Sequence, residues 1–169
     1  MRILASVTMC HKKQVKMPTH AEKRIMPYTA QQMYDLIADV GTYPQFLPWC
    51  AAARIRKRSQ RGDAEIVDAE LVISFKVFRE KFGSRVTLLP NEQKIDVEYL
   101  DGPFKYLNNH WSFADCEGGC EVDFFVDFEF KSKILQSIIG VVFGEAMQRI
   151  VGAFETRANA LYGTDDTIG

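Results

Sequence analysis

Side chains that commonly act as metal ligands or nucleophiles are few in this sequence and far apart. The three histidines, His11, His20 and His110, share no local motif, and the four cysteines form no dense disulfide pattern. Cys116 and Cys120 are separated by three residues, so we expect them to face each other across a hairpin turn. A structural zinc site needs more ligands than these two thiols. The pattern therefore predicts free thiols in a reducing cytoplasm and no metal centre.

Acid–base catalysis would require a pair of titratable side chains that converge on one site. Arg79, Glu80 and Lys81 form a charge run of the kind that usually lies at a solvated strand end. Glu80 also shares a strand face with Phe78 and Phe82, which leaves an inward orientation open, and a buried carboxylate would need a partner. The sequence has no glycine-rich phosphate-binding loop. We therefore disfavour an unaided catalyst, although a fold can bring distant residues together.

The segment Tyr43-Pro44-Gln45-Phe46-Leu47-Pro48-Trp49-Cys50 concentrates large apolar side chains in irregular backbone. Its two prolines lack a backbone N–H and restrict φ, which excludes an ordinary α-helix or a central strand. We expect a rigid turn that joins a helix to a strand. The apolar side chains of this turn would either plug the end of a cavity or form a lipid-facing gate, and the residues assigned to that role are Phe46, Leu47 and Trp49.

Length and composition are those of one globular domain. The chain has 169 residues, 47% of them hydrophobic and 25% charged, with a formal net charge of −1. Its first 16 residues carry four bases and no acid, which leaves a charge of −5 on the rest. We therefore interpret residues 1–17 as a disordered or non-native leader, 18–163 as one domain and 164–169 as a flexible tail. The acidic balance does not favour DNA as a partner.

Local signals outline a first strand and helix, followed by a series of strands. A strand is expected over residues 20–26. Thr29 and Gln32 form a capping-box pattern, an apolar face follows at helical spacing, and Gly41 is expected to end the helix. From residue 51 to residue 131, alternating segments are separated by turn signals at 60–63, 90–92, 101–103 and 117–119. One-sided strands at this spacing predict an antiparallel sheet.

A long helix is predicted at the C-terminus. Ser132 is its candidate N-cap and Gly163 its candidate end, which gives a length of roughly 45 Å. Residues 134–143 are apolar nearly all round, but this run is shorter than the roughly 20 residues that a membrane span needs. Two alternatives stay open for this first half: deep burial, or a surface that meets a membrane or a partner.

The order of these elements predicts an α+β fold. A strongly curved antiparallel sheet of about seven strands wraps around the long C-terminal helix, and one or two short helices follow the first strand. A curved sheet that grips one helix leaves a space unless large side chains fill it, and such pockets are mostly apolar. The inward-facing and loop residues that we assign to ligand binding are Phe46, Leu47, Trp49, Val67, Leu71, Ile73, Phe82, Val97, Leu107, Asn109, Trp111, Phe113, Val142 and Met147.

Two motifs carry a resemblance to a known family. The segment 43–50 is one, and Asp101-Gly102-Pro103-Phe104-Lys105-Tyr106-Leu107 followed by Trp111-Ser112-Phe113 is the other. Over residues 18–163 the sequence resembles the START-like helix-grip superfamily. Within it, the sequence is similar to the coenzyme Q-binding, polyketide cyclase/dehydrase-related family that includes ribosome association toxins.

The resemblance implies a non-enzymatic lipid-binding protein. It would hold ubiquinone or a related isoprenoid quinone, without a catalytic cofactor, as a carrier or chaperone that supports respiratory electron transport. The expected location is the cytoplasm, with peripheral contact at the inner membrane left open. Asn109 is a candidate donor to a quinone carbonyl, although a backbone partner is the expected outcome for a buried amide.

Two other functions stay open. The first is a ribosome-associating toxin that blocks subunit association, for which the sequence offers a local basic cluster of Arg54, Arg56, Lys57, Arg58 and Arg61. The same cluster also fits a solvated hairpin end or anionic lipid headgroups. The second is a polyketide cyclase-type enzyme, which the inward-facing positions support least because they offer mainly aliphatic and aromatic side chains.

Overall fold

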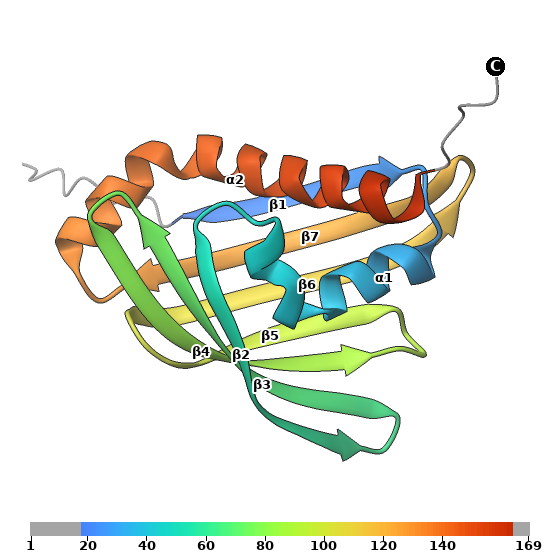
Figure 1. The fold of residues 1–169 in the computed structure, drawn as a ribbon, viewed down its shortest axis with the longest axis horizontal. Coiled ribbons are helices and arrows are strands. Elements are labelled where there is room, and N and C mark those ends of the chain that lie inside the picture. Colours follow the sequence, from blue (N-terminus) through green and yellow to red (C-terminus); the bar gives the residue numbers. More distant parts are fainter. Residues whose placement is uncertain (1–17, 164–169) are drawn as a thin grey trace, which may run out of the picture.

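The structure, a computed structural model, describes residues 18–163 and confirms the predicted α+β helix-grip architecture (Figure 1). The expected leader and tail lie outside the described residues. The elements in chain order are β1 (Thr19–Met26), α1 (Ala30–Ala38), the 3₁₀ helix η1 (Val40–Gln45), β2 (Cys50–Arg61), β3 (Ala64–Phe75), β4 (Phe78–Leu89), β5 (Lys94–Asp101), β6 (Phe104–Cys116), β7 (Gly119–Phe130) and α2 (Lys133–Tyr162).

The seven strands form one antiparallel sheet in the order β1-β7-β6-β5-β4-β3-β2, so that β1 and β2 are its edges. Side chains alternate between the two faces of a strand, and β7 shows this alternation along its length. Val122, Phe124 and Val126 are buried, whereas the residues between them are half-buried. Figure 1 shows the sheet curving so that its concave side faces α1 and α2.

The first helix begins as predicted and ends earlier than predicted. The Thr29 hydroxyl accepts a hydrogen bond from the Gln32 backbone N–H at 3.1 Å, and the Thr29 N–H donates to the Gln32 side chain at 2.9 Å. The helix ends at Ala38, and the expected stop, Gly41, lies inside η1. The carbonyl of Ile37 would be unpaired at this helix end, and the Tyr43 hydroxyl donates to it at 2.6 Å. Tyr43 therefore fastens η1 to the end of α1.

The C-terminal helix lies along the concave side of the sheet, above β1 and β7 (Figure 1). Its N-cap is Ser132, as predicted, and Gly163 follows its last turn. It is long and apolar enough to cross a membrane by length and composition, with a window of mean hydropathy 1.4, yet only 6% of that window is buried. In residues 134–143, Leu135 and Gln136 are buried, whereas Ile134 and Val141 point into solvent. The alternative that residues 134–143 are deeply buried is therefore wrong.

Buried side chains form two clusters that meet beneath α2. The first packs α1 against the inner face of β3–β7 and the second half of α2. The second is rich in phenylalanine and lies beneath the first half of α2. Trp111 and Ile150 contact both clusters. The two clusters together hold the helix against the sheet.

The pairing of β6 with β7 corrects the expectation for the cysteines. Cys116 pairs with Gly119 and Asp115 pairs with Cys120, so the two cysteines do not face each other. Cys120 is buried and Cys116 is exposed, and both are free, as is the buried Cys50. Burial, with smaller contributions from Asp115 and Cys116, raises the pKa of Cys120 to about 11.

The hydrogen bond from Tyr43 to Ile37 generates a test of this corner. Tyr43→Phe removes the donor and leaves the Ile37 carbonyl without its partner, which should lower the free energy of unfolding by about 1 to 3 kcal/mol. Thermal or urea unfolding measures the loss. The matched control is Tyr28→Phe, because the Tyr28 hydroxyl is exposed and lies 3.5 Å from Asn159. Equal stability of the two variants would show that the hydroxyl of Tyr43 does not fasten η1.

Candidate functional site

A cavity of about 220 Å³ lies between the concave face of the sheet and α2. Strands β3 to β7 form its floor, and Ile37 of α1, Val40 of η1 and the segment that leads into β2 close one side. Met147, Ile150 and Phe154 of α2 form its roof. The wall is almost wholly aliphatic and aromatic, so the cavity is suited to an apolar ligand.

The polar groups on the wall are few and mostly occupied. Asn109 donates from its side-chain amide to the Phe125 carbonyl at 2.8 Å and accepts from the Trp111 indole N–H at 2.9 Å. The expected backbone partner of Asn109 is therefore present. A side-chain amide has two donor hydrogens, so one N–H of Asn109 remains beyond the bond to Phe125. Ser84 is 3% exposed and adds a hydroxyl to the wall.

No charged side chain lines this cavity among the residues that the structure describes. Its two titratable groups are Tyr43 and Cys50. Burial raises the pKa of Tyr43, with smaller contributions from Cys50 and Asp39. Burial also raises the pKa of the Cys50 thiol, against a small opposing effect of the backbone hydrogen bond to Ala52. Both groups are therefore neutral at neutral pH, and the cavity carries no charge.

Most of the residues assigned to ligand binding from the sequence line this cavity. They come from the turn before β2, from four strands and from α2, and they are Leu47, Leu71, Ile73, Phe82, Val97, Leu107, Asn109, Trp111 and Met147. Their common wall shows that strand parity places inward-facing residues together. Binding of a ligand by these residues stays a prediction.

Five of the assigned residues lie elsewhere. Val67 and Phe113 are buried in the first cluster, where the Phe113 ring meets Tyr34 edge-on at 6.0 Å. Phe46 covers the outer side of Phe154, at 5.4 Å between ring centroids, and carries the Arg157 guanidinium over its face. Trp49 packs edge-on against Phe75 at 5.3 Å, in a groove that Val142 also lines.

The outward position of Trp49 follows from its backbone. Its φ of 62° lies in the left-handed region, which a bulky residue adopts at a cost. The Trp49 carbonyl accepts a hydrogen bond from the Ser74 N–H at 2.8 Å, and this bond holds the segment against the end of β3. Leu47, Pro48 and Cys50 face the cavity while Trp49 faces outward. In this segment, therefore, Leu47 closes the cavity and Trp49 covers the groove outside it.

Several cavity residues were missed from the sequence. Phe124 and Val126 lie on the face of β7 that the alternating pattern marked as inward, and Ile37 lies on the apolar face of α1. Among these missed residues, Phe154 makes the most aromatic contacts, because its ring packs against those of Tyr43, Phe46 and Trp111. The apolar periodicity identified these residues as buried, but it did not distinguish a cavity wall from solid core.

A smaller space of about 70 Å³ adjoins the cavity beneath the first half of α2. It shares Ile73 and Phe82 with the cavity, and Leu135 and Ile139 of α2 cover it. Glu80 also lines this space, so its side chain lies on the inward face of β4, the orientation that the strand parity left open. Phe75 belongs both to this space and to an outer groove of about 330 Å³. A series of spaces therefore leads from the cavity toward the β3–β4 turn, and charged side chains line only its outer part.

A network of polar side chains joins β1 to α2 on the side of the molecule away from the β3–β4 turn. Arg24 donates to Glu155 of α2 and, through Nε, to Glu22 at 2.9 Å. His20 lies 2.8 Å from the second oxygen of Glu22. Burial raises the pKa of Glu22, but the hydrogen bonds from His20 and Arg24 outweigh it, and the net pKa is lowered. No cluster that could hold a metal occurs among residues 18–163.

Comparison with known proteins places this arrangement in context. A family model described as polyketide cyclase/dehydrase and lipid transport matches residues 26–155. The ribosome association toxin RatA of Rickettsia prowazekii is 42% identical over 138 residues, which are 80% of this chain and 92% of that protein.

A second relative carries a different name. The mitochondrial coenzyme Q-binding protein COQ10 homolog B of Xenopus laevis is 32% identical over 152 residues, which are 87% of this chain and 60% of that protein. The solution structure of an 18 kDa protein from Caulobacter crescentus is 36% identical, with a TM-score of 0.74, and the match covers 88% of this chain and 100% of that one.

Asn109 and its neighbour Asn108 provide a matched pair for testing the cavity wall. Asn109→Ala leaves the Phe125 carbonyl and the Trp111 indole N–H without partners, so we expect the free energy of unfolding to fall by about 1 to 3 kcal/mol. Asn108 is exposed on the opposite face of β6, and Asn108→Ala should change stability by less than about 0.5 kcal/mol. Urea unfolding followed by tryptophan fluorescence measures both variants. Equal losses would contradict the described role of the Asn109 amide.

Proposed function

Because the chain belongs to the polyketide cyclase/dehydrase and lipid transport family, as its two motifs predicted, we propose that it binds a hydrophobic ligand in the cavity between the sheet and α2. The ligand class is an isoprenoid quinone such as ubiquinone. The role is that of a non-enzymatic carrier or chaperone that supports respiratory electron transport. The observation that carries the proposal is the uncharged, apolar cavity of about 220 Å³ in a fold whose relatives include a named coenzyme Q-binding protein.

The wall of the cavity suits a quinone ring. The Trp111 indole and the Phe124 ring stack at 4.2 Å and present flat apolar surface, which stabilises a bound ring by removing it from water. The free N–H of Asn109 and the hydroxyl of Ser84 are the donors available to a quinone carbonyl. The uncharged wall offers no carboxylate–imidazole pair, which supports binding rather than cyclase chemistry.

The size of the cavity bears on how a prenyl tail is held. A volume of about 220 Å³ is smaller than the roughly 300 to 1,000 Å³ of typical small-molecule pockets. It therefore fits a ring and the first part of a tail. The rest of a tail would continue into the adjoining space beneath Leu135 and Ile139, toward the β3–β4 turn. A long tail would displace the first half of α2, whose Leu135 and Ile139 side chains cover that space.

Trp111 provides a direct reporter for quinone binding. The chain has two tryptophans, so Trp49→Phe leaves Trp111 on the cavity wall as the sole tryptophan, which can be excited selectively over tyrosine. Titration with a short-tailed ubiquinone should then quench the fluorescence in a saturable way. In the same background, Val97→Phe with Val126→Phe fills the cavity and should weaken binding by about tenfold or more, as expected when at least 1.4 kcal/mol of contact is lost.

The matched control is Val72→Phe. Val72 lies on β3 between Leu71 and Ile73, whose side chains face the cavity. Because side chains alternate along a strand, the Val72 side chain faces outward. The substitution should leave the affinity unchanged. Circular dichroism checks that the filled variant is folded, since overpacking costs about 1 to 3 kcal/mol. Equal quenching of the filled and control variants, or no saturable quenching at all, would contradict quinone binding in this cavity.

A second candidate function is binding to ribosomes, which the name of the 42% identical relative raises. In the structure, part of the predicted basic cluster on β2 is neutralised by ion pairs. Arg56 pairs with Glu70 at 2.6 Å and with Asp101 at 2.7 Å, and Arg58 pairs with Glu65 at 2.7 Å. Arg54, Lys57 and Arg61 are exposed and form no ion pair within the described part of the chain. These three cations, along an edge strand, are the observation that favours a ribosomal RNA contact.

Cosedimentation with ribosomal subunits tests this second candidate. If the β2 edge binds ribosomal RNA, the triple variant Arg54→Glu, Lys57→Glu, Arg61→Glu should lose about tenfold or more in affinity at moderate salt. The control variant Lys76→Glu, Arg79→Glu, Lys133→Glu makes the same charge change on another surface and should bind like the wild type. The absence of any subunit shift with the wild-type protein would exclude the ribosomal role.

A further inference from the structure

The most exposed large apolar side chains of the described chain gather at one end of the molecule. They are Val77 in the β3–β4 turn, which is 90% exposed, and Ile134 and Val141 of α2, which are 71% and 85% exposed. Ile134 and Val141 are seven residues apart and therefore project from the same side of the helix. The turn lies against this half of α2, because Phe75 and Phe78 line spaces that Ile139 and Val142 also line (Figure 1).

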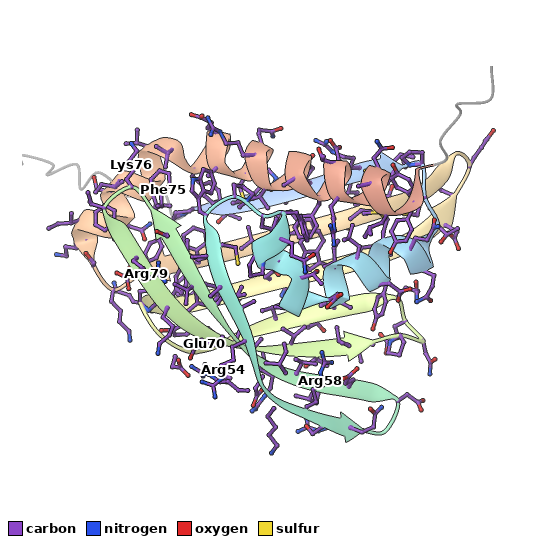
Figure 2. All side chains as sticks on the ribbon, viewed as in Figure 1. Arg54, Arg58, Glu70, Phe75, Lys76 and Arg79 are labelled. Carbon is purple, nitrogen blue, oxygen red and sulfur yellow. The ribbon has the colours of Figure 1, made fainter. Side chains whose placement is uncertain are left out.

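Basic residues lie close to these apolar residues in the sequence. Lys76 and Arg79, which Figure 2 labels, stand on either side of Val77. Lys131 and Lys133 precede Ile134. All four are exposed, and within residues 18–163 none of them forms an ion pair. The first turn of α2 has no acidic residue, so the positive end of the helix dipole adds to the same field. The positive potential of these residues repels other cations and attracts an anionic surface.

We propose that this end of the molecule docks on an anionic lipid bilayer. The docking face consists of Lys76, Val77, Arg79, Lys131, Lys133, Ile134 and Val141. Apolar side chains would enter the boundary between headgroups and acyl chains, and the surrounding cations would contact anionic headgroups, which is the pattern of interfacial membrane binding. A second protein would also cover apolar side chains, but the neighbouring cations, which form no ion pair within residues 18–163, favour a lipid surface of opposite charge.

The docking face lies at the end of the path that leaves the cavity. The space beneath Leu135 and Ile139 adjoins the cavity on one side and Phe75 on the other, next to Lys76. A ligand that entered or left beneath the first half of α2 would therefore pass directly between the cavity and the bilayer. This link to the cavity rests on the proposed function, whereas docking on lipid does not.

Flotation with lipid vesicles tests the proposal on the full chain. The protein should float with vesicles that contain phosphatidylglycerol, by about tenfold or more over vesicles of phosphatidylcholine alone, and the excess should fall as salt rises. Lys76→Glu with Lys133→Glu should lower the partition by about tenfold or more, because each reversed cation loses an attraction and gains a repulsion. Ile134→Ser with Val141→Ser should lower it to a similar extent, because it removes the inserted apolar area.

Matched controls make the same changes elsewhere on the surface. Lys57→Glu with Arg61→Glu, and Ile25→Ser with Leu161→Ser, alter exposed residues outside the docking face. Both should change the partition by less than about twofold, because these residues lie outside the docking face and electrostatic attraction falls off within about a Debye length. Wild-type protein that does not float, or docking-face variants that float like the controls, would overturn the proposal. Loss of ribosome binding or self-association in those variants, with unchanged flotation, would also overturn it.

Quinone binding is measured separately on the same variants. Quenching of Trp111 by detergent-solubilised ubiquinone should be unchanged in both docking-face variants, since none of the substituted residues lines the cavity. Loss of flotation with intact quenching supports a docking face that is distinct from the cavity. Intact flotation of the wild type without any quenching would contradict the quinone proposal and leave lipid docking standing.

Discussion

The structure depends on how one helix is fastened across a curved sheet. Near its start, α2 is held by buried Leu135 and by Gln136, whose side chain accepts a hydrogen bond from the Phe130 N–H at 2.8 Å. Near its end it is held by Phe154, which packs against Tyr43 and Trp111. Between these two points α2 spans the concave face of the sheet and leaves room beneath Met147 and Ile150 (Figure 1). The cavity is the space that remains beneath the middle of the helix.

This constraint also explains why the two halves of α2 differ. The second half packs on α1, η1 and β6 through the Phe154 cluster, and the pair Arg24–Glu155 ties it to the edge strand β1. The first half covers the small space that leads out of the cavity, and its Ile134 and Val141 side chains are exposed. Beside it, Trp49 and Lys76 both adopt left-handed φ values, of 62° and 53°. Strained backbone of this kind persists where the surrounding structure fixes it and is common at functional sites.

Much of the fold could be predicted because local chemistry and global packing agree. The Thr29 capping box, the strict alternation of β7 and the apolar periodicity of α2 all identify their elements without help from tertiary contacts. The β3–β4 turn was not predictable, since Lys76 and Val77 carry no turn signal and the left-handed φ of Lys76 is imposed by the hairpin. The register of Cys116 and Cys120 also escaped prediction, because Gly119 rather than Cys120 pairs with Cys116.

The candidate site was predictable as a face but not as a shape. Strand parity placed Leu71, Val97 and Trp111 on one wall, whereas it could not separate them from Val67 and Phe113, which have the same parity and lie in solid core. The apolar composition of the first half of α2 was equally ambiguous, because buried and lipid-facing helices share it. Which residues border empty space depends on how α2 is anchored, and that is a property of the whole fold.

The most direct test of the central claim is extraction of the full-length protein with organic solvent, after purification from cells without added quinone, followed by mass spectrometry. An apolar cavity in contact with the cell's lipids should retain a ligand of its own class. We expect a prenylated quinone in substantial proportion to protein, and less of it in the variant whose cavity is filled at Val97 and Val126. Repeated extraction that yields no prenylated quinone, or equal amounts from both proteins, would contradict the account.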